Sequence, residues 1–507
     1  MAYADIQDGV KRNRYTYQTR WGREDIKPYQ GVKAFLFLDG ENKGKADPIE
    51  AGELANLLTG KGIQEAINWG LLSIIDEDIP QLLQIQPVFP FFLKAKLAEL
   101  DAANREALRE GFKNHYIGLA LSYNRYMESK EPQERQIGIF FCRLEYENLY
   151  NALQICLEKQ ENIDIFFCLG EYLKLTNDIP SSLKLSEFVY QAQVTYPPEI
   201  RTGEIGLKII MVLGTLANCY LQTQNYPQAR EFYLRILKLS QQLQGVEATQ
   251  IKSLLASTHH QLGYVAQELR EYNQARDYYQ QALEIFIEFG DRYSSARTYH
   301  QLGRVAEELR EYDQARDYYQ QALEINIEFG DRYSCASTYQ NLGIVAQKLR
   351  EYYQARDYYQ QALEINIEFG DRYSCAGIYQ NLGIVAQKLR EYDQARDYYQ
   401  QALEIKIEFG DRYNCARTYH NLGNVAQELR EYDQARDYYQ QALEINIEFG
   451  DRYSSASTYG LLGLLAQAQE NYAEARANLQ TALEIYVEYQ DEYMATVTRE
   501  NLEDLPE

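Results

Sequence analysis

The apolar residues of this chain follow a helical rhythm that begins anew every forty residues. The phrase EYNQARDYYQQALEI starts at residue 271, and close copies of it start at 311, 351, 391 and 431. Within residues 291–330 apolar residues recur at steps of three and four, which places them on one face of a helix. Two such stripes occur, Tyr299, Leu302, Val305, Ala306 and Leu309, and then Ala315, Tyr318, Tyr319, Ala322, Leu323 and Ile325. Because residues 310–312 between them suffice only for a tight turn, each unit is predicted to be a helix pair.

The boundaries between units carry stop and start signals. Gly330 suits the left-handed position after a helix, and the Asp331 that follows favours a new amino terminus. In the copy near residue 226, Pro227 fits the first position of a second helix. Gly303, in the middle of a first helix, costs roughly 0.5–1 kcal/mol relative to alanine, yet it recurs as Gly263, Gly343, Gly383, Gly423 and Gly463. Its recurrence predicts a close approach by the neighbouring helix, with alanines as the matching small surfaces, Ala315 and Ala322.

The spacing of these residues resembles the consensus of the tetratricopeptide repeat family, in a longer, forty-residue form. The matching positions in one unit are Tyr299, Leu302, Gly303, Ala306, Ala315, Tyr319 and Ala322. The family's late proline is absent, and Ile327 stands there. The resemblance implies an all-α fold, a right-handed superhelix or α-solenoid, over residues 206–490. Seven repeats are expected, with first helices centred near Leu216, Leu262, Leu302, Leu342, Leu382, Leu422 and Leu462, and residues 491–507 as a capping helix and tail.

The letters that change from unit to unit lie mainly on the first helix. Between residues 291 and 450 the phrase QARDYYQQALEI never varies, whereas the changing positions recur at steps of three and four on one face of the first helix. The resemblance places that face on the concave wall of the superhelix, where the family binds peptides. The candidate peptide-binding residues are Arg297, His300, Arg304, Gln340, Ile344, Lys348, Gln380, Ile384, Lys388, Arg417, His420 and Asn424.

Two interpretations of this variation stay open. Recently duplicated units diverge first at any solvated position, which would make the pattern mere drift. The outer surface of the second helix is also solvated, however, and it has barely changed, which favours a selected binding surface. Ile344 and Ile384, each followed one turn later by Lys348 or Lys388, suit a partner with an apolar anchor and a nearby acid. Copying of one unit into the next would place the same residues there.

Composition excludes several other classes of function. The net charge of −23 disfavours nucleic acid and anionic lipid as partners. The seven cysteines form no CxxC pair and predict reduced thiols in a cytoplasmic protein. The start of the chain has no apolar signal segment, and no uncharged stretch of about 18 apolar residues predicts a membrane span. Repeat-related histidines such as His260 and His300 would lie about 10 Å apart, too far to share a metal ion. No metal or other cofactor is expected.

The first two hundred residues do not repeat. Residues 31–63 resemble part of the CHAT domain, a caspase-like peptidase, as a strand, a turn and a helix from about Pro48 to Leu58. The family's catalytic histidine and cysteine are missing, because the first histidine is His115 and the first cysteine is Cys142. Residues 1–63 are therefore expected to be a truncated, weakly ordered α/β remnant. Residues 64–100 resemble the winged-helix-like helical segment of STAND signalling ATPases, although no phosphate-binding GxxxxGK[ST] loop occurs. Residues 101–205 are expected to be a helical linker with degenerate repeats.

The sequence thus predicts a non-catalytic, cytoplasmic scaffold or adaptor that binds a protein or peptide along its concave face. One alternative is the sensor or regulatory part of a CHAT-type peptidase or STAND signalling system. A second alternative is an enzyme, namely a vestigial peptidase completed by a partner chain. The identity of the partner and the oligomeric state are left open by the sequence.

Overall fold

The computed structural model describes residues 72–74, 83–85 and 100–506. After Leu100 the regular elements of this described part are all α-helices. The chain divides into two compact units, one ending at Ile251 and one running from Lys252 to Glu507. Each unit is built by consecutive helices that pack on one another, so each has its own interior.

The first unit is a compact group of helices. Their bounds are α6 (Ala102–Met127), α7 (Pro132–Leu144), α8 (Tyr146–Glu158), α9 (Asp164–Leu175), α10 (Ile179–Val194), α11 (Pro198–Thr202), α12 (Glu204–Gln222) and α13 (Tyr226–Ser240). Leu149, Leu153 and Phe166 are fully buried in its interior. Within the described residues, one helix has a window long and apolar enough to cross a membrane, Ile205–Gln222 of α12, and 44% of that window is buried. This window includes the charged residue Lys208, which forms an ion pair with Asp164 at 2.8 Å.

Two short strands precede these helices. β1 (Leu72–Ile74) pairs antiparallel with β2 (Leu83–Ile85), with Leu72 opposite Ile85. The segment 64–100 was expected to be helical, and these six residues are strand instead. Their sequences, LSI and LQI, alternate apolar and polar residues, which is the period of a strand and not of a helix. The rest of that segment, and the predicted α/β remnant of residues 1–63, lie outside the described residues.

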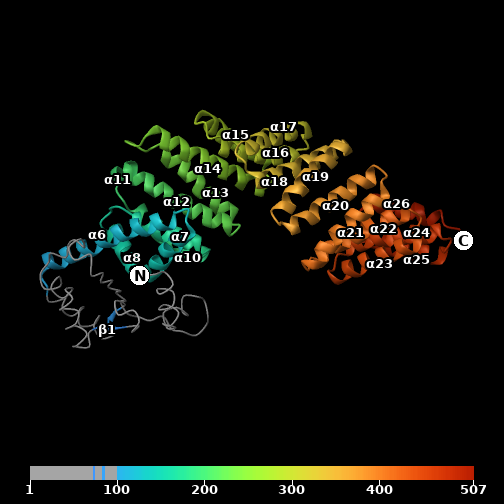
Figure 1. The fold of residues 1–507 in the computed structure, drawn as a ribbon, viewed down its shortest axis with the longest axis horizontal. Coiled ribbons are helices and arrows are strands. Elements are labelled where there is room, and N and C mark those ends of the chain that lie inside the picture. The colour runs from blue at the N-terminus through green and yellow to red at the C-terminus, as the bar shows by residue number, and fades with distance from the viewer. Residues whose placement is uncertain (1–71, 75–82, 86–99, 507) are drawn as a thin grey trace. The chain divides into compact units, whose positions relative to one another are not determined.

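Helix pairs in chain order make up the remainder, which confirms the predicted all-α solenoid. Figure 1 shows them from green to red, each helix followed by its partner. After α12 and α13, the pairs are α14 (Ala248–Glu268) with α15 (Tyr272–Glu288), α16 (Arg292–Glu308) with α17 (Tyr312–Glu328), α18 (Arg332–Lys348) with α19 (Tyr352–Glu368), α20 (Arg372–Lys388) with α21 (Tyr392–Glu408), α22 (Arg412–Glu428) with α23 (Tyr432–Glu448) and α24 (Arg452–Ala468) with α25 (Tyr472–Glu488). A last helix, α26 (Glu492–Glu503), packs on α25.

The turns between units follow the predicted stop and start signals. Gly330 has φ +68°, and the next residue, Asp331, donates its backbone N–H to the Asn326 carbonyl at 2.9 Å. This hydrogen bond closes the helix in a left-handed cap. The Asp331 carboxylate then accepts from the Ser334 backbone N–H at 3.0 Å and caps α18. Within a unit the turn uses the same cap with an arginine, because Arg310 has φ +61°. A non-glycine residue is uncommon in this conformation.

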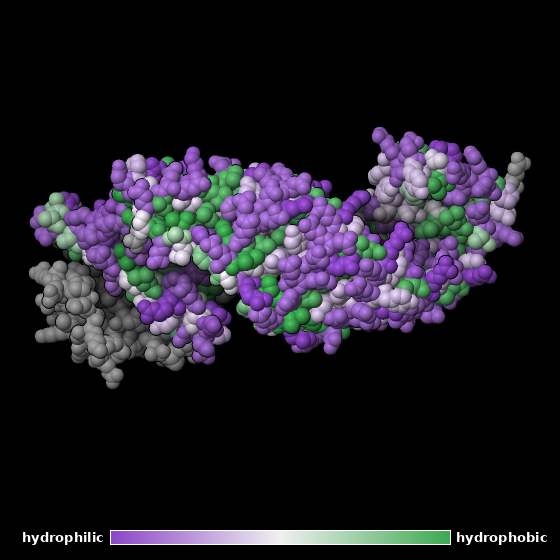
Figure 2. Space-filling model, turned by 90° about the horizontal axis from the view of Figure 1, so that it is seen from above, coloured by the Kyte–Doolittle hydropathy of each residue, from purple (hydrophilic) through white to green (hydrophobic). Residues whose placement is uncertain are grey.

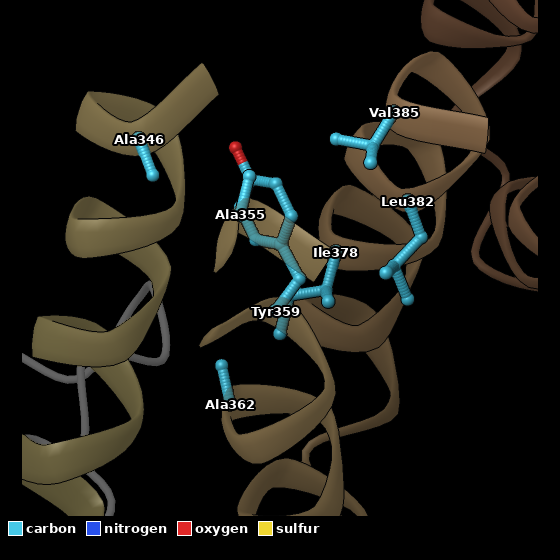
Figure 3. Packing of buried hydrophobic residues seen from close by; sticks show 7 residues of the cluster. All are labelled: Ala346, Ala355, Tyr359, Ala362, Ile378, Leu382 and Val385. Atoms are coloured by element: carbon cyan, nitrogen blue, oxygen red, sulfur yellow. The ribbon is translucent and has the colours of Figure 1, made fainter. Parts of the chain in front are cut away.

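The repeated glycine of the first helix faces a tyrosine ring. A Cβ atom on Gly303 would lie 2.6 Å from a ring carbon of Tyr319, and Gly343 stands in the same relation to Tyr359. The predicted close approach is therefore made by the tyrosine side chain of the second helix, and not by paired small residues. In Figure 3 the Tyr359 ring lies between the helix of Ala346 and the helix of Leu382 and Val385. Each unit thus fills its core jointly with the first helix of the next unit.

Candidate functional site

The solvent-facing side of helices α16, α18, α20 and α22 carries all the candidate peptide-binding residues, and we call it the first-helix face. Five of the twelve candidates are exposed, Arg297, Arg304, Lys348, Lys388 and Arg417. Six are half-buried, His300, Gln340, Ile344, Ile384, His420 and Asn424. The remaining candidate, Gln380, is fully buried. The structure thus keeps eleven candidates at least partly accessible to solvent.

Neighbouring first helices touch along this face. The Nε2 atom of His300 on α16 lies 3.0 Å from Nδ2 of Asn341 and 3.5 Å from Oγ of Ser337, both on α18. Burial lowers the pKa of His300 to about 4, and the nearby Arg304 guanidinium contributes to this lowering, so this side chain is neutral at pH 7. His260 is in the same state, with its pKa also lowered to about 4 by burial. His260, which contacts Thr298 Oγ1 at 3.1 Å, and His300 therefore join units by hydrogen bonds and add no charge to the face.

Gln380 is buried under the first-helix face, where it contacts a lysine of the second helix. Lys406 of α21 donates from Nζ to the Gln380 Oε1 atom at 2.9 Å, and Thr418 of α22 donates to the same oxygen at 2.8 Å. The equivalent position in the neighbouring units is an asparagine, as at Asn366. Gln380 was predicted as a candidate, but the structure buries it fully, because the longer Lys406 in the second helix of the same unit engages its amide. The sequence signal was Lys406 itself, which stands where Asn326, Asn366 and Asn446 stand in the other units between residues 291 and 450.

The half-buried apolar candidates also have a packing role. Ile344 contacts the core cluster that contains Tyr359 and Leu382, and Ile384 contacts the corresponding cluster around Tyr399. Each isoleucine therefore lies over the boundary to the next unit, with part of its side chain left in solvent. Their apolar character is partly explained by this packing, which sequence reasoning alone did not foresee.

Some variable positions of the first helix hold the core tyrosines. The hydroxyl of Tyr359 donates to Gln347 Oε1 at 3.1 Å, and Tyr399 donates to Gln387 at the same distance. In the unit of α16 the acceptor is Glu307, whose pKa is raised by burial. Asn424 accepts from its tyrosine, Tyr439, at 2.8 Å. The side-chain oxygen of Asn424 thus accepts a hydrogen bond from a core tyrosine. The exposed basic residues of the face make no such contact with the core tyrosines.

Charge is sorted between the two helices of each unit. In the first-helix segments 291–310, 331–350, 371–390 and 411–430, Lys and Arg together outnumber Asp and Glu by six. In the second-helix segments that follow them, up to residue 450, Asp and Glu outnumber Lys and Arg by fourteen. The first helices are therefore basic relative to the second helices of a strongly acidic protein.

The described residues offer little for chemistry of other kinds. They contain no group of three or more His, Cys, Asp or Glu side chains that could hold a metal ion. All seven cysteines lie in this part, each is buried, and no two of them form a disulfide. Burial raises the pKa of the repeated cysteine, as at Cys335. A shallow cavity of about 90 Å³ between α14 and α16 is lined by Ser257, His260, Gln261, Phe286, Ser294 and Arg297.

Comparison with known proteins identifies the repeats. The tetratricopeptide repeat family matches residues 254–328, 334–408 and 414–488, so this array belongs to that family. Similar solved structures include the apo form of RapI (18% identity over 56% of this chain and 99% of that one, TM-score 0.43). Others are BtubC from P. vanneervenii (21%, 46% and 92%, TM-score 0.39) and PilF of Pseudomonas aeruginosa (20%, 49% and 98%, TM-score 0.37). No curated protein matches the chain.

Proposed function

We propose that this tetratricopeptide repeat chain is a non-catalytic scaffold that binds an extended, acidic segment of a partner protein along its first-helix face. The family supports a protein-binding scaffold in general. The choice of face and of an acidic partner goes further and rests on how the charged residues of the described chain are paired.

The basic residues of the face are left without ion pairs, and this observation carries the proposal. Within the described residues Arg297, Arg304, Lys348, Lys388 and Arg417 form no ion pair. The arginines of the second helices behave differently, because each is paired with a glutamate of the next unit: Arg276 with Glu311, Arg316 with Glu351, Arg356 with Glu391, Arg396 with Glu431 and Arg436 with Glu474. Unpaired basic residues that are exposed together are available to an acidic ligand.

An acidic segment is also guided to this face by the rest of the molecule. The acidic second helices repel a negatively charged ligand, whereas the first-helix face attracts it. Such complementarity raises the association rate and weakens as salt screens the charges. The half-exposed Ile344 and Ile384, with Lys348 and Lys388 one turn away, add an apolar contact beside a basic one.

The seven cysteines bear on where the protein works. All are buried, and burial raises the pKa of several thiols, including Cys335 and Cys415. Buried thiols of this kind behave as small apolar residues and stay reduced in a reducing compartment. The proposal therefore includes a cytoplasmic location for the chain.

The test is a selection from short random peptides displayed on phage, using the full chain. We expect peptides rich in Asp and Glu with at least one large apolar residue. The affinity of a synthetic selected peptide, measured by fluorescence anisotropy, should fall about tenfold or more when Lys348→Glu and Lys388→Glu are combined. It should also fall as sodium chloride is raised, because exposed charges are screened.

A matched control reverses charge on the second helices instead. Glu364→Lys with Glu404→Lys changes two exposed residues of α19 and α21 and should leave the affinity unchanged or slightly higher. All four positions are exposed, so the fold is preserved in both variants, and circular dichroism checks this. Selection of no peptide at all, or equal binding by the Lys348/Lys388 variant, would refute the proposal.

A further inference from the structure

Large apolar side chains are exposed at the turns that join the successive helix pairs from α15 to α24. Each such turn carries an isoleucine, a phenylalanine and a tyrosine. This surface, which we call the turn edge, consists of Ile327, Phe329 and Tyr333 with their equivalents at each forty-residue step, up to Ile447, Phe449 and Tyr453. The isoleucines are 57–60% exposed, and most of the aromatic residues are about half exposed. Figure 2 shows green hydrophobic patches among hydrophilic residues on the face that it displays.

The turn edge is continuous along the array. The ring of Tyr373 at the start of α20 lies 5.5 Å from the ring of Phe409 at the end of α21. The hydroxyl of Tyr373 also donates to Asp411 of the next unit at 3.0 Å. Tyr413 repeats both contacts one unit later, with Phe449 and Asp451. Each tyrosine therefore links its own turn to the next one, and the apolar residues form a row and not isolated spots.

Charged residues beside the turn edge are paired with one another. Arg332 lies 2.7 Å from Glu368, and the equivalent pairs Arg372–Glu408 and Arg412–Glu448 measure 2.8 and 2.7 Å. The charged residues at the edge are thus already paired, whereas its apolar side chains are exposed to solvent. This is the reverse of the first-helix face, whose basic residues have no ion-pair partners within the described chain. An occupant of the edge needs apolar surface and no particular net charge.

The exposed area is large enough for a stable interface. Half of a Phe or Tyr side chain exposes on the order of 100 Å². Three such residues in each of four units give roughly 1,000 Å², whereas the largest apolar patch on a typical monomer is about 300–600 Å². A standard protein interface buries about 800 Å² on each partner. The summed apolar surface of the turn edge is therefore of the size that a standard interface buries on each partner.

We propose that the turn edge is a self-association surface, covered by the turn edge of a second copy of this chain. A row of apolar triplets at a fixed spacing is covered along its length only by a partner with the same spacing. An identical repeat array supplies that spacing. Two copies related by a two-fold axis bring the same row together from both sides, as in an isologous dimer.

Net charge sets the salt dependence of this association. Each copy carries −23, so two copies repel one another at low ionic strength, while the edge itself contributes apolar attraction. Added salt screens the repulsion and should strengthen the dimer. Binding of an acidic peptide to the first-helix face has the opposite dependence, so the two surfaces can be told apart in one protein.

Light scattering after size exclusion measures the mass directly. The full chain at micromolar concentration and high sodium chloride should have twice its chain mass of 59.1 kDa. Combining Ile327→Ser, Ile367→Ser, Ile407→Ser and Ile447→Ser should give the monomer mass and raise the dissociation constant at least about a hundredfold. These side chains are mostly in solvent, so the fold should remain intact, as circular dichroism would verify.

The matched control places four serines on the same helices away from the edge. Gln320→Ser, Gln360→Ser, Gln400→Ser and Gln440→Ser alter exposed residues and should leave the dimer intact. A wild-type chain that stays monomeric at all salt concentrations would overturn the proposal, as would an isoleucine variant that remains dimeric. A monomeric chain that sediments with phosphatidylcholine vesicles would also overturn it, by assigning the edge to lipid. Peptide binding at the first-helix face is measured separately and is unaffected by these outcomes.

Discussion

Units 331–370 and 371–410 differ at only four of their forty positions, yet the boundaries that they form have different interiors. The differing pairs are Ser337 and Gly377, Thr338 and Ile378, Tyr353 and Asp393, and Asn366 and Lys406. The boundary between these two units is apolar, because Ile378 is fully buried in the cluster with Tyr359 and Leu382. At most equivalent positions of the array a threonine stands instead, and its hydroxyl donates to the carbonyl four residues earlier.

The next boundary, between 371–410 and 411–450, is polar at the corresponding place. Lys406 is 5% exposed, and its Nζ donates to Gln380 at 2.9 Å and to Thr418 at 2.7 Å. No carboxylate within the described residues forms an ion pair with Lys406. The two boundaries of unit 371–410 therefore differ through one residue each. Ile378 makes the boundary with the preceding unit apolar, and Lys406 places a buried amine at the boundary with the following unit. In a stacked array, stability is a sum over such neighbouring contacts.

The largest effect expected is loss of a core tyrosine, and it should be equal in the two units. Tyr359 and Tyr399 are both fully buried over a glycine of the first helix, and each hydroxyl donates at 3.1 Å to a glutamine. Tyr359→Ala and Tyr399→Ala should each lower the free energy of unfolding by about 3–5 kcal/mol, as other large-to-small core substitutions do. Urea unfolding followed by circular dichroism measures the change.

The control for this pair is Tyr353→Ala, because the Tyr353 side chain is 69% exposed. Its effect should stay within about 0.5 kcal/mol. A much smaller loss for Tyr399→Ala than for Tyr359→Ala would show that the boundary with the buried lysine is loosely packed. The claim that the two cores are equivalent would then fail.

The second effect concerns the buried lysine and depends on pH. Burial lowers the pKa of Lys406 from 10.5 to about 8, and the nearby Arg417 contributes to this lowering, while Cys415 and Asp411 oppose it. The folded state therefore disfavours the proton that the unfolded chain keeps. The corresponding stability is fully present above pH 10.5 and is lost as the pH falls to about 8. The loss amounts to about 3 kcal/mol, at about 1.36 kcal/mol for each pH unit.

Lys406→Asn isolates this contribution, because asparagine is the residue of the neighbouring units. Urea unfolding of both proteins between about pH 7 and pH 10 should show the wild type gaining stability relative to the variant as the pH rises. Asn366→Ala, at the equivalent place one unit earlier, provides a control whose difference from wild type should be flat over this range, since it introduces no titratable group at this buried site. A wild-type and Lys406→Asn difference that is independent of pH would contradict the assignment.

Much of this architecture could be predicted from the spacing of residues, because the features concerned depend on residues close together in the sequence. Helix periodicity, the Gly330–Asp331 boundary and the repeating Gly303 depend on one stretch of chain, so they can be recognised in the sequence. The side chain that packs against Gly303 could not be recognised in this way. Ala315, Ala322 and Tyr319 all stand at suitable spacing, and only the packed structure shows that the Tyr319 ring contacts the glycine. Arg310 in a left-handed conformation was also missed, since glycine is the usual residue there.

The candidate face shows the same division. Helix periodicity placed its residues on one side, but their accessibility depends on which side chains of other helices pack against them. Gln380 has nearly the same sequence neighbours as Gln340, and it is buried because Lys406 reaches it from another helix. The ion pairs of the second helices join residues 35 positions apart, such as Arg276 and Glu311. Which basic residues are paired, and that Lys348 and Lys388 are not, therefore depends on contacts between distant residues that the sequence does not reveal.

The smallest effect expected comes from the position at which Tyr353 replaces the usual aspartate. Helix α21 has Asp393 in its first turn, whereas α19 has no acid there. An acid near a helix amino terminus stabilises it by about 0.3–1 kcal/mol. Against this, the Arg356 guanidinium lies 5.8 Å from the Tyr353 ring centroid, a cation–π contact that contributes about 0.5 kcal/mol when exposed.

Tyr353→Asp should therefore raise the free energy of unfolding by no more than about 0.5 kcal/mol at low salt, and the gain should shrink as salt screens the helix dipole. Asp393→Tyr should have the opposite sign and a similar size, because the two units are otherwise alike at this turn. Paired urea titrations at two salt concentrations measure both changes. If Tyr353→Asp instead lowers stability by more than about 1 kcal/mol, beyond the usual range for an exposed site, the ring packs against the surface that it shares with Arg350 and Leu389, and the two turns are not equivalent.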